Sequence, residues 1–363
     1  MAHEIDFLAV GDGERSGDAI ALRYGNGGAH TIHVIDGGDI DAGERMVGHI
    51  RAYYGNPGYI DAVVCTHGDD DHSSGLRRVI EAFDVGGIWM NRPWLYVWEI
   101  VHLFDDGRLT PESLERRLRE AYPILDEIES MAAERGIPVH EAFQGTNVGA
   151  FTILAPSRER YLELIPQFSR APEQARYSGA GGLGVSGILA QTKQAVRAVA
   201  EWIAEEWGIE TLEEEVETSA SNESSVVQLA ELDGNRVLLT GDAGVVSLHE
   251  AADYAELIGH RLPGVRFIQV PHHGSRHNVN PSSLNRWVGD PVGQGETRGT
   301  SAHVSAGKES ETHPRKKVVN AFMRRGAKVY STKGQSLRHC HDMLPREGWS
   351  PVTPHDFSPI VEG

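Results

Sequence analysis

The residues best suited to chemistry lie in one short segment, His67-Gly68-Asp69-Asp70-Asp71-His72. Its imidazoles and carboxylates directly follow an apolar run at residues 60–65, which is typical of a buried strand. Side chains of these types on a loop at a strand end can converge on a metal cation with little loss of side-chain entropy. An exposed acidic turn would give no reason for a histidine at both ends. The segment therefore predicts a metal site.

Three further polar segments support the same site, because each follows or lies near an expected strand end. The sequence Thr240-Gly241-Asp242 delivers one carboxylate, although by itself it could form an Asx-type turn or a helix cap. The adjacent His272 and His273 follow an apolar run, where histidines are seldom core residues. His313 precedes an expected helix and by itself fits a helix start equally well. Because α/β proteins gather sites from loops distant in sequence, the combination is more specific than any member.

Two other catalytic chemistries find no support in the sequence. A Ser-His-Asp hydrolase of the α/β type would place a Gly-x-Ser-x-Gly elbow after a strand, and no expected strand is followed by one. A thiol catalyst is not indicated either, because Cys65 falls inside the expected strand at residues 60–65 and is expected in the core. A metal-activated water is therefore the favoured nucleophile.

The composition limits which cellular compartments and which classes of partner are expected. With only Cys65 and Cys340 the chain has no disulfide framework, and nothing suggests an oxidising compartment. The first residues are acidic where a signal peptide would be basic, and no apolar run approaches the roughly 18 residues of a membrane span. We therefore expect a cytoplasmic protein with no membrane partner. The chain has 34 basic and 52 acidic residues and therefore a net charge of −18. This charge argues against a protein that binds nucleic acid over its whole surface.

The net charge does not exclude a local basic groove. The densest basic run lies on an expected helix that directly follows His313. Such a run is typical of a solvated helix face, but a helix start that faced the metal site would bind phosphate. The run consists of Arg315, Lys316, Lys317, Arg324, Arg325 and Lys328.

Alternating strands and helices are expected to position these segments. The N-terminal part predicts one helix, at residues 43–54, and strands at 5–10, 19–24, 31–35 and 60–65. After about residue 220 the sequence predicts strands at 225–232, 236–239, 265–270, 302–305 and 327–331 and helices at 247–259, 281–288 and 314–325.

The middle region, residues 91–220, is expected to be a mainly helical insertion. Helical spacing over about 94–135 and 187–217 flanks one strand-like run, Phe151–Ala155. The end of the region is strongly acidic, which is typical of a solvated helix face and linker. The expected domain organisation is a hydrolase domain over residues 1–335, interrupted by this insertion, and a C-terminal tail over 336–363.

The combined segments resemble a known family. His67-x-Asp69-x-Asp71-His72 is similar to the His-x-(His/Asp)-x-Asp-His signature of the metallo-β-lactamase superfamily. The similarity is closer to the metallo-hydrolase domain of the DNA-uptake protein ComEC and its free-standing relatives, in which aspartate typically takes the second position. It covers about residues 1–90 and 220–335. Further segments in the family's order are Phe7-Leu8-Ala9-Val10-Gly11-Asp12-Gly13, Val34-Ile35-Asp36-Gly37-Gly38, Asn222-x-Ser224-Ser225, Leu239-Thr240-Gly241-Asp242, His272-His273-Gly274-Ser275 and His313-Pro314.

The sequence departs from the family pattern in two places. The usual Gly-x-Gly-Asp-Ala opening is interrupted by Glu14-Arg15-Ser16-Gly17, and Thr312 replaces the glycine that usually precedes the His-Pro pair. Both departures bear on the substrate more than on the fold.

This resemblance implies the fold class α/β, as an αββα sandwich with a metal site at one edge between the two sheets. It also implies a site for two divalent ions. His67 and Asp69 would hold one ion, and Asp71 and His72 the other, with Asp242 bridging them.

The resemblance leaves the remaining ligands open. Either His272 or His273, together with His313, would complete the site or contact the scissile phosphate. The histidine that the superfamily usually carries between the first motif and the Gly-Asp motif has no clear candidate here. Asp69 in place of a histidine makes the site richer in oxygen and shifts its preference from zinc towards manganese.

The implied chemistry is hydrolysis. Two bound cations make hydroxide available near neutral pH and neutralise charge in the transition state. Asp71 is best placed to orient that water or to take its proton. We therefore expect a metal-dependent hydrolase, with phosphodiesterase or nuclease activity favoured. One alternative is a hydrolase of a small molecule, such as a cyclic nucleotide, lactone or other ester, whose pocket is closed by the insertion. Another is a non-catalytic partner protein that docks another chain through residues 91–220.

Overall fold

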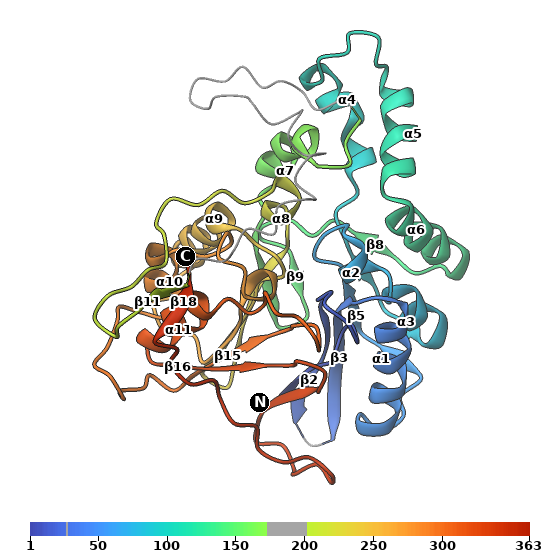
Figure 1. Cartoon of the computed structure of the whole chain (residues 1–363). Helices are drawn as coiled ribbons and strands as arrows, with labels where there is room; N and C mark the ends of the chain where they lie inside the picture. Colours follow the sequence, from blue (N-terminus) through green and yellow to red (C-terminus); the bar gives the residue numbers. More distant parts are fainter. Residues whose placement is uncertain (27, 173–201) are drawn as a thin grey trace.

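The computed structural model describes residues 1–26, 28–172 and 202–363, which form two mixed seven-stranded sheets (Figure 1). The first sheet has the order β17-β1-β2-β3-β5-β7-β8, and the second has the order β16-β15-β14-β13-β12-β10-β9. The strands of the first sheet are β1 (Ala2–Phe7), β2 (Ala19–Asn26), β3 (Ala29–Gly37), β5 (Ala62–Val64), β7 (Ile88–Trp89), β8 (Val139–His140) and β17 (Leu337–His341). Those of the second are β9 (Asn147–Val148), β10 (Phe151–Ala155), β12 (Val227–Leu232), β13 (Asn235–Leu239), β14 (Phe267–Gln269), β15 (Thr300–Val304) and β16 (Ala327–Ser331).

Alternating side chains along the strands build three apolar layers. Ile35 of β3 packs between the sheets with Phe7 and Phe267, whereas its neighbour Val34 faces the helices outside the first sheet. The helices outside the first sheet are α1 (Ile40–Tyr53), α3 (Leu76–Ala82) and α6 (Pro123–Arg135), and those outside the second are α9 (Val245–Leu257), α10 (Pro281–Trp287) and α11 (Lys316–Arg324). This arrangement confirms the expected αββα sandwich.

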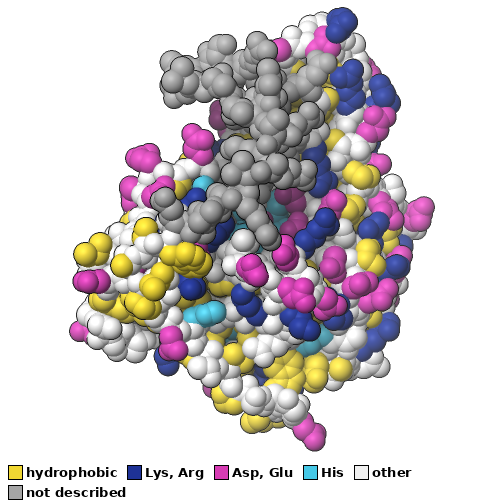
Figure 2. Space-filling model, viewed as in Figure 1, with side chains coloured by type: hydrophobic (Ala, Val, Ile, Leu, Met, Phe, Trp, Pro, Cys, Tyr) yellow, Lys and Arg dark blue, Asp and Glu magenta, His cyan; other side chains and the backbone are white. Residues whose placement is uncertain are grey.

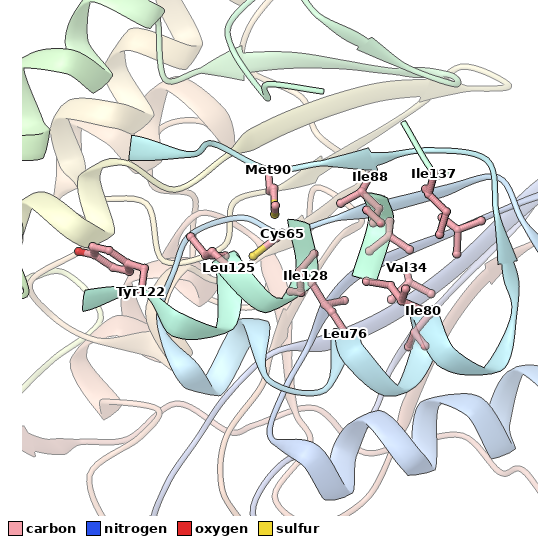
Figure 3. Close-up of a cluster of buried hydrophobic side chains, with 14 of the residues drawn as sticks. Val34, Cys65, Leu76, Ile80, Ile88, Met90, Tyr122, Leu125, Ile128 and Ile137 are labelled. Carbon is pink, nitrogen blue, oxygen red and sulfur yellow. The ribbon is translucent and has the colours of Figure 1, made fainter. Parts of the chain in front are cut away.

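The apolar cluster between the first sheet and its helices contains Cys65. Figure 3 shows Cys65 among Leu76, Leu125 and Ile128, and its side chain is buried in this cluster. The expectation that Cys65 belongs to the core is confirmed. Among the helices of the described residues, none combines the length and the apolar character required to cross a bilayer.

Parallel strands bring the chemistry-bearing loops to one edge. In the first sheet β3, β5, β7 and β8 run parallel, and in the second β13, β14, β15 and β16 do so. The carboxyl ends of parallel strands meet at the same edge of a sheet, where sites of α/β proteins commonly form. The loops after β3, β5, β13, β14 and β15 therefore lie close together in space.

The middle region differs from the expected insertion. Its helical part runs from η1 (Pro93–Tyr96) through α4 (Val97–Ile100), η2 (Val101–Leu103) and α5 (Pro111–Ala121) to α6. The same region, however, supplies β8 to the first sheet and β9 and β10 to the second. Residues 91–220 are thus partly an extension of the sandwich. The helices α7 (Arg158–Leu164) and α8 (Ala220–Glu223) and the turn η3 (Ile165–Gln167) complete the described part of the region.

The expectation of a helix over residues 187–217 is wrong for its described part. Residues 187–201 lie outside the described residues, and 202–217 contain a short strand, β11 (Trp202–Ala204), followed by turns and irregular chain. Two of its acidic side chains pair with α11: Arg324 bonds Glu205 at 3.0 Å, and Arg325 bonds Glu210 at 2.7 Å. We call residues 202–217 the acidic strap. Its glutamates satisfy buried arginines, which a solvated helix could not do.

The C-terminal segment is not a free tail. β17 pairs antiparallel with β1, from His3 opposite His341 to Phe7 opposite Leu337. The strand β18 (Ile360–Glu362) pairs with β11 of the acidic strap. The polar composition of β17 concealed this strand, because its pairing with β1 rather than local propensity defines it. The remaining described strands, β4 (Tyr59–Ile60) and β6 (Asp84–Val85), form a small separate pair, so the expected strand at 60–65 is divided.

The pH dependence of stability tests whether His303 is buried between the sheets as a neutral side chain. Burial, with a smaller contribution from His339, lowers the pKa of His303 to about 3, whereas the unfolded chain protonates near 6.5. As the pH falls, the unfolded state therefore takes up this proton before the folded state does. The stability that neutral His303 contributes above pH 6.5 is lost as the pH falls from 6.5 towards 3. His303→Gln should reduce the slope of unfolding free energy against pH by up to about 1.4 kcal/mol per pH unit.

Urea unfolding at a series of pH values measures that slope. His102→Gln, at an exposed histidine, is the control and should keep the wild-type slope. An unchanged slope in His303→Gln would contradict the neutral burial of this side chain.

Candidate metal centre

The segment that follows β5 positions the first group of candidate ligands. His67 lies in the loop after this strand, and a single helical turn, α2 (Asp70–Ser73), carries Asp71 and His72. This turn packs directly against the end of β3, since a Cβ at Gly75 would lie only 2.0 Å from the carbonyl oxygen of Gly37. Glycine at position 75 thus permits the close approach that brings His72 to the residues after β3.

Asp242 lies at the middle of the site. Its Oδ1 is 3.3 Å from His72 Nε2 and 3.9 Å from His273 Nε2. Its Oδ2 is 3.6 Å from His272 Nε2 and 3.9 Å from His67 Nε2. Each carboxylate oxygen of Asp242 therefore faces two imidazole nitrogens, one from the loop after β5 and one from the loop after β14.

The turn after β14 directs its two histidines to different oxygens. The turn η5 (Pro271–Gly274) holds His272 at φ 45° and His273 at φ 56°, the left-handed region that non-glycine residues seldom adopt. The two rings stand 5.5 Å apart at an angle of 65°. Such backbone strain is concentrated at functional sites, where the surrounding structure holds it. Sequence reasoning left His272 and His273 as alternatives, whereas the structure places the Nε2 atoms of both near Asp242.

Several buried atoms of the centre have no hydrogen-bond partner among the described residues. These atoms are His67 Nε2, His72 Nε2, His273 Nε2 and Asp242 Oδ1. A buried polar atom without a partner is costly, and imidazole nitrogens with carboxylate oxygens are the donor set of zinc and manganese. The residues therefore fit a divalent metal ion.

Hydrogen bonds at the Nδ1 atoms orient two of these rings. His72 Nδ1 lies 2.7 Å from Asp36 Oδ2, and His273 Nδ1 lies 3.1 Å from the carbonyl oxygen of Ser305. Both partners can only accept, so each Nδ1 carries the hydrogen and the lone pair remains on Nε2. Asp36 also accepts from the backbone N–H of Thr66 at 2.8 Å and from its hydroxyl at 2.6 Å. This carboxylate ties the end of β3 to the loop after β5.

Asp69, Asp71 and His313 lie at the border of the centre. Asp69 Oδ2 is 3.4 Å from His67 Nε2, and Asp71 Oδ2 is 3.8 Å from His273 Nε2. The Asp71 side chain is 46% exposed and, with His273 and His313, lines a cleft of about 780 Å³. The ring of His313 is 6.3 Å from that of His272, so His313 lies beside the centre at the cleft. All the site residues expected from the sequence are thus brought together.

Comparison with known proteins agrees with this geometry. Residues 13–138 match the family model of the metallo-beta-lactamase superfamily, a range that includes His67 to His72. Over this range the chain is similar to the metallo-beta-lactamase superfamily, whose members are generally metal-dependent hydrolases. The fold described above is the fold of that superfamily. No curated protein matches the chain in sequence.

Several solved structures are similar to the chain at low sequence identity. CmlA, a diiron beta-hydroxylase from Streptomyces venezuelae, is 11% identical with a TM-score of 0.42, and the match covers 94% of this chain and 54% of CmlA. A diphosphatase from the PhnP family is 12% identical with a TM-score of 0.38, covering 94% of this chain and 98% of that one. A subclass B3 metallo-beta-lactamase from a soil metagenome library is 11% identical with a TM-score of 0.27, covering 78% and 85%.

Mutual attraction between histidines and carboxylates shifts pKa values at this centre. Burial disfavours a charged His72, but Asp242 and Asp36 outweigh it and hold the pKa of His72 well above its usual range. Burial likewise disfavours charge on Asp242, but His72, His272 and His273 hold its pKa well below the usual range. Metal binding at His72 would therefore have to displace a proton from this ring.

The structure adds two carboxylates that the sequence reasoning did not select as site residues. Asp18 is 2% exposed, accepts from Gln269 Nε2 at 2.8 Å and forms a possible metal-binding group with Asp242 and His273. Burial raises the pKa of Asp18. Asp18 directly follows the interrupted glycine-rich opening, and Asp36 lies in the Ile-Asp-Gly-Gly segment, so both could have been selected from those motifs.

Among the described residues, no side chain of the basic run lines the cleft. Lys317, Arg324 and Arg325 are buried, and the two arginines pair with the acidic strap. In the part of the chain that the structure describes, the basic side chains that line the cleft are instead Arg15 and Arg170. On the face shown in Figure 2, Lys and Arg are interspersed with Asp and Glu and form no continuous basic surface.

Proposed function

We propose that the protein is a two-metal phosphodiesterase, in which Asp242 would be a ligand shared by two divalent cations. The observation that carries this proposal is the pairing of four imidazole Nε2 atoms with the two oxygens of Asp242. A single carboxylate faced on both sides by imidazole lone pairs has the arrangement that a bridging ligand needs. The proposal keeps the expected similarity to the ComEC metallo-hydrolase domain.

The ligands divide into two positions. His67, Asp69 and His272 surround Asp242 Oδ2, and we call this the first position. Around Oδ1, the second position is formed by Asp71, His72 and His273. In this assignment both adjacent histidines are ligands. His272 supplies the imidazole for which the sequence between the first motif and Asp242 offered no candidate.

The two positions suit manganese as well as zinc. Carboxylates at Asp69, Asp71 and Asp242 favour manganese, while four imidazoles retain affinity for zinc. Bound cations of either kind lower the pKa of water and offset the charge that develops on a phosphoryl group during hydrolysis. Asp18 lies near the second position and adds a further carboxylate.

The chain's own side chains act at the cleft. Half-exposed Asp71 can hold an attacking water in line and accept its proton, since a carboxylate is an adequate base for an acidified water. Burial, with smaller contributions from His273 and His272, lowers the pKa of His313 to about 4, which keeps this ring neutral near pH 7. A neutral imidazole can donate an N–H to a phosphoryl oxygen, and the Thr312 hydroxyl lies 3.0 Å from His313 Nδ1 to orient it.

The cleft favours a short substrate over a long nucleic acid. Besides Arg15 and Arg170 it is lined by several carboxylates, and Arg170 is already paired with Asp70 at 2.8 Å. Together with the net charge of −18, this lining offers few contacts for a polymer of phosphates. A cytoplasmic location and a protein partner docked through residues 91–220 remain predictions.

Cleavage assays with Mn²⁺ or Zn²⁺ test the proposal. Wild type should hydrolyse bis(p-nitrophenyl) phosphate and short or cyclic nucleotides faster, per bond, than linear or circular DNA. Asp71→Ala should lower kcat by about 10²- to 10³-fold because the water loses its base. Asp84→Ala, at an exposed aspartate paired with Arg135, is the matched control and should keep full activity.

Two results would overturn the proposal. Wild type that holds no divalent metal after reconstitution and desalting would remove the whole assignment. Metal-loaded wild type that cleaves lactones or carboxylic esters but no phosphodiester would replace phosphodiesterase with a small-molecule esterase.

A further inference from the structure

We propose that Asn278 is a positioning residue that fixes the tautomer of His272 and thereby controls the affinity of the first metal position. The inference rests on the proposed function, because it takes His272 as a ligand. Asn278 lies in the loop after η5, is 1% exposed and touches no other candidate ligand through its amide oxygen. It therefore acts through His272.

The orientation of the Asn278 amide is fixed by its donors. Asn278 Nδ2 donates to the carbonyl oxygen of Asp242 at 2.8 Å and lies 3.4 Å from that of Ala243. A carbonyl oxygen accepts only, so the nitrogen of the amide must be on this side. The opposite atom, Oδ1, is then the one that stands 2.8 Å from His272 Nδ1.

This orientation decides which nitrogen of His272 carries the hydrogen. An amide oxygen can only accept, so the contact requires a hydrogen on His272 Nδ1. In the neutral ring the lone pair is then on Nε2, which lies 3.6 Å from Asp242 Oδ2. One buried amide thus holds both the backbone of Asp242 and the ring of His272.

A second amide is compatible with the same tautomer. Asn222 also contacts His272 Nδ1, at 3.0 Å, and among the described residues no other hydrogen bond holds its side-chain amide. Exchange of its amide oxygen and nitrogen, which have nearly the same shape, presents a second acceptor to the N–H of His272. Asn278 is the residue whose orientation is determined independently of His272.

The other imidazoles of the centre depend on different partners. His72 is held by the Asp36 carboxylate, His273 by the backbone carbonyl of Ser305, and His67 lies 3.1 Å from the Thr66 hydroxyl. Removal of the Asn278 amide should therefore weaken the first position, in which His272 is a ligand, more than the second. Loss of such an outer hydrogen bond typically lowers metal affinity by 10- to 100-fold.

A double-mutant cycle on the full-length protein tests this inference, with Zn²⁺ alone as the probe. Zinc affinity is measured by competition with a chromogenic chelator, and zinc content by mass spectrometry. Asn278→Ala should weaken one of the two ions by about 10- to 100-fold and the other less. In the His272→Ala background, the same substitution should have a clearly smaller effect, because only the hydrogen bond to the Asp242 backbone is then lost.

Two further variants separate positioning from general damage to the loop. Asn278→Asp, whose carboxylate accepts the same N–H but cannot donate to the Asp242 carbonyl oxygen, should restore part of the zinc affinity. Asn280→Ala removes another buried amide two residues away, which caps α10 and bonds Glu214 rather than His272. This control should bind both ions as wild type does.

The outcomes distinguish this inference from the proposed function. Wild type that binds no zinc overturns the proposed function. If wild type and Asn278→Ala both bind two ions with the same affinities, only the role of Asn278 is overturned. Equal weakening in both backgrounds, no restoration by Asn278→Asp, or equal weakening by Asn280→Ala also overturns it.

Discussion

Asp242→Asn is expected to reduce bound metal from two ions per chain to less than one and phosphodiester cleavage to the background rate. An amide is neutral and has one oxygen, so it cannot supply one anionic oxygen to each position. Each position would then retain its imidazoles without the carboxylate that they share. Because activity in the proposed mechanism depends on both positions, the effect should exceed that of Asp71→Ala.

Metal analysis after desalting and steady-state kinetics measure this effect together. Asp253→Asn, on the exposed side of α9 and paired with Arg286, is the control that should keep two ions and wild-type rates. Circular dichroism shows whether the Asp242 variant is folded. A folded variant that retained both ions would exclude Asp242 as the shared ligand.

Glu205→Ala is expected to lower the free energy of unfolding by about 3–5 kcal/mol. Glu205 is 2% exposed, accepts from Arg324 at 3.0 Å and also accepts from the backbone and hydroxyl of Thr211 at 2.9 Å. The guanidinium of Arg324 is buried as well, and truncation of Glu205 would leave its charge without a counter-ion. Loss of this one carboxylate should weaken the attachment of the acidic strap to α11, which the Arg325–Glu210 pair still supports.

Urea unfolding of the metal-saturated protein checks this value. Glu206→Ala is the matched control, since the next glutamate along the strap is exposed and its side chain should contribute no more than about 0.5 kcal/mol. A Glu205 variant as stable as wild type would show that hydration of Arg324 replaces the ion pair.

The sequence predicted the parts of the fold that carry local signals. Apolar runs such as Phe151–Ala155 and Ala327–Ser331 became strands with the expected bounds, because β-branched and aromatic side chains specify a buried strand by themselves. β8 and β9 have two residues each and are defined by their pairing. The acidic strap was misinterpreted because its partners lie more than a hundred residues away, on α11.

The residues of the candidate site likewise include some that the sequence predicted and some that it did not. His67, His72, Asp242 and the two adjacent histidines were predicted because each belongs to a short segment dense in ligand types. Gln269 and Asn278 were not, because a single amide in a strand or loop carries no pattern. Their importance comes from geometry: Gln269 Oε1 accepts from the N–H groups of Thr240 and Gly241, so it holds the turn that bears Asp242.

The position of β17 beside β1 has a consequence for synthesis of the protein. Ribosomes make β1 more than three hundred residues before its neighbour β17, so one edge of β1 stays unpaired for most of translation. An open strand edge invites pairing with other chains. β1 carries two buried acidic side chains, Glu4 and Asp6, and Glu4 takes one arginine, Arg23, from β2 and another, Arg338, from β17. Until Arg338 emerges, the incompletely neutralised carboxylates give the nascent edge a charge that resists aggregation.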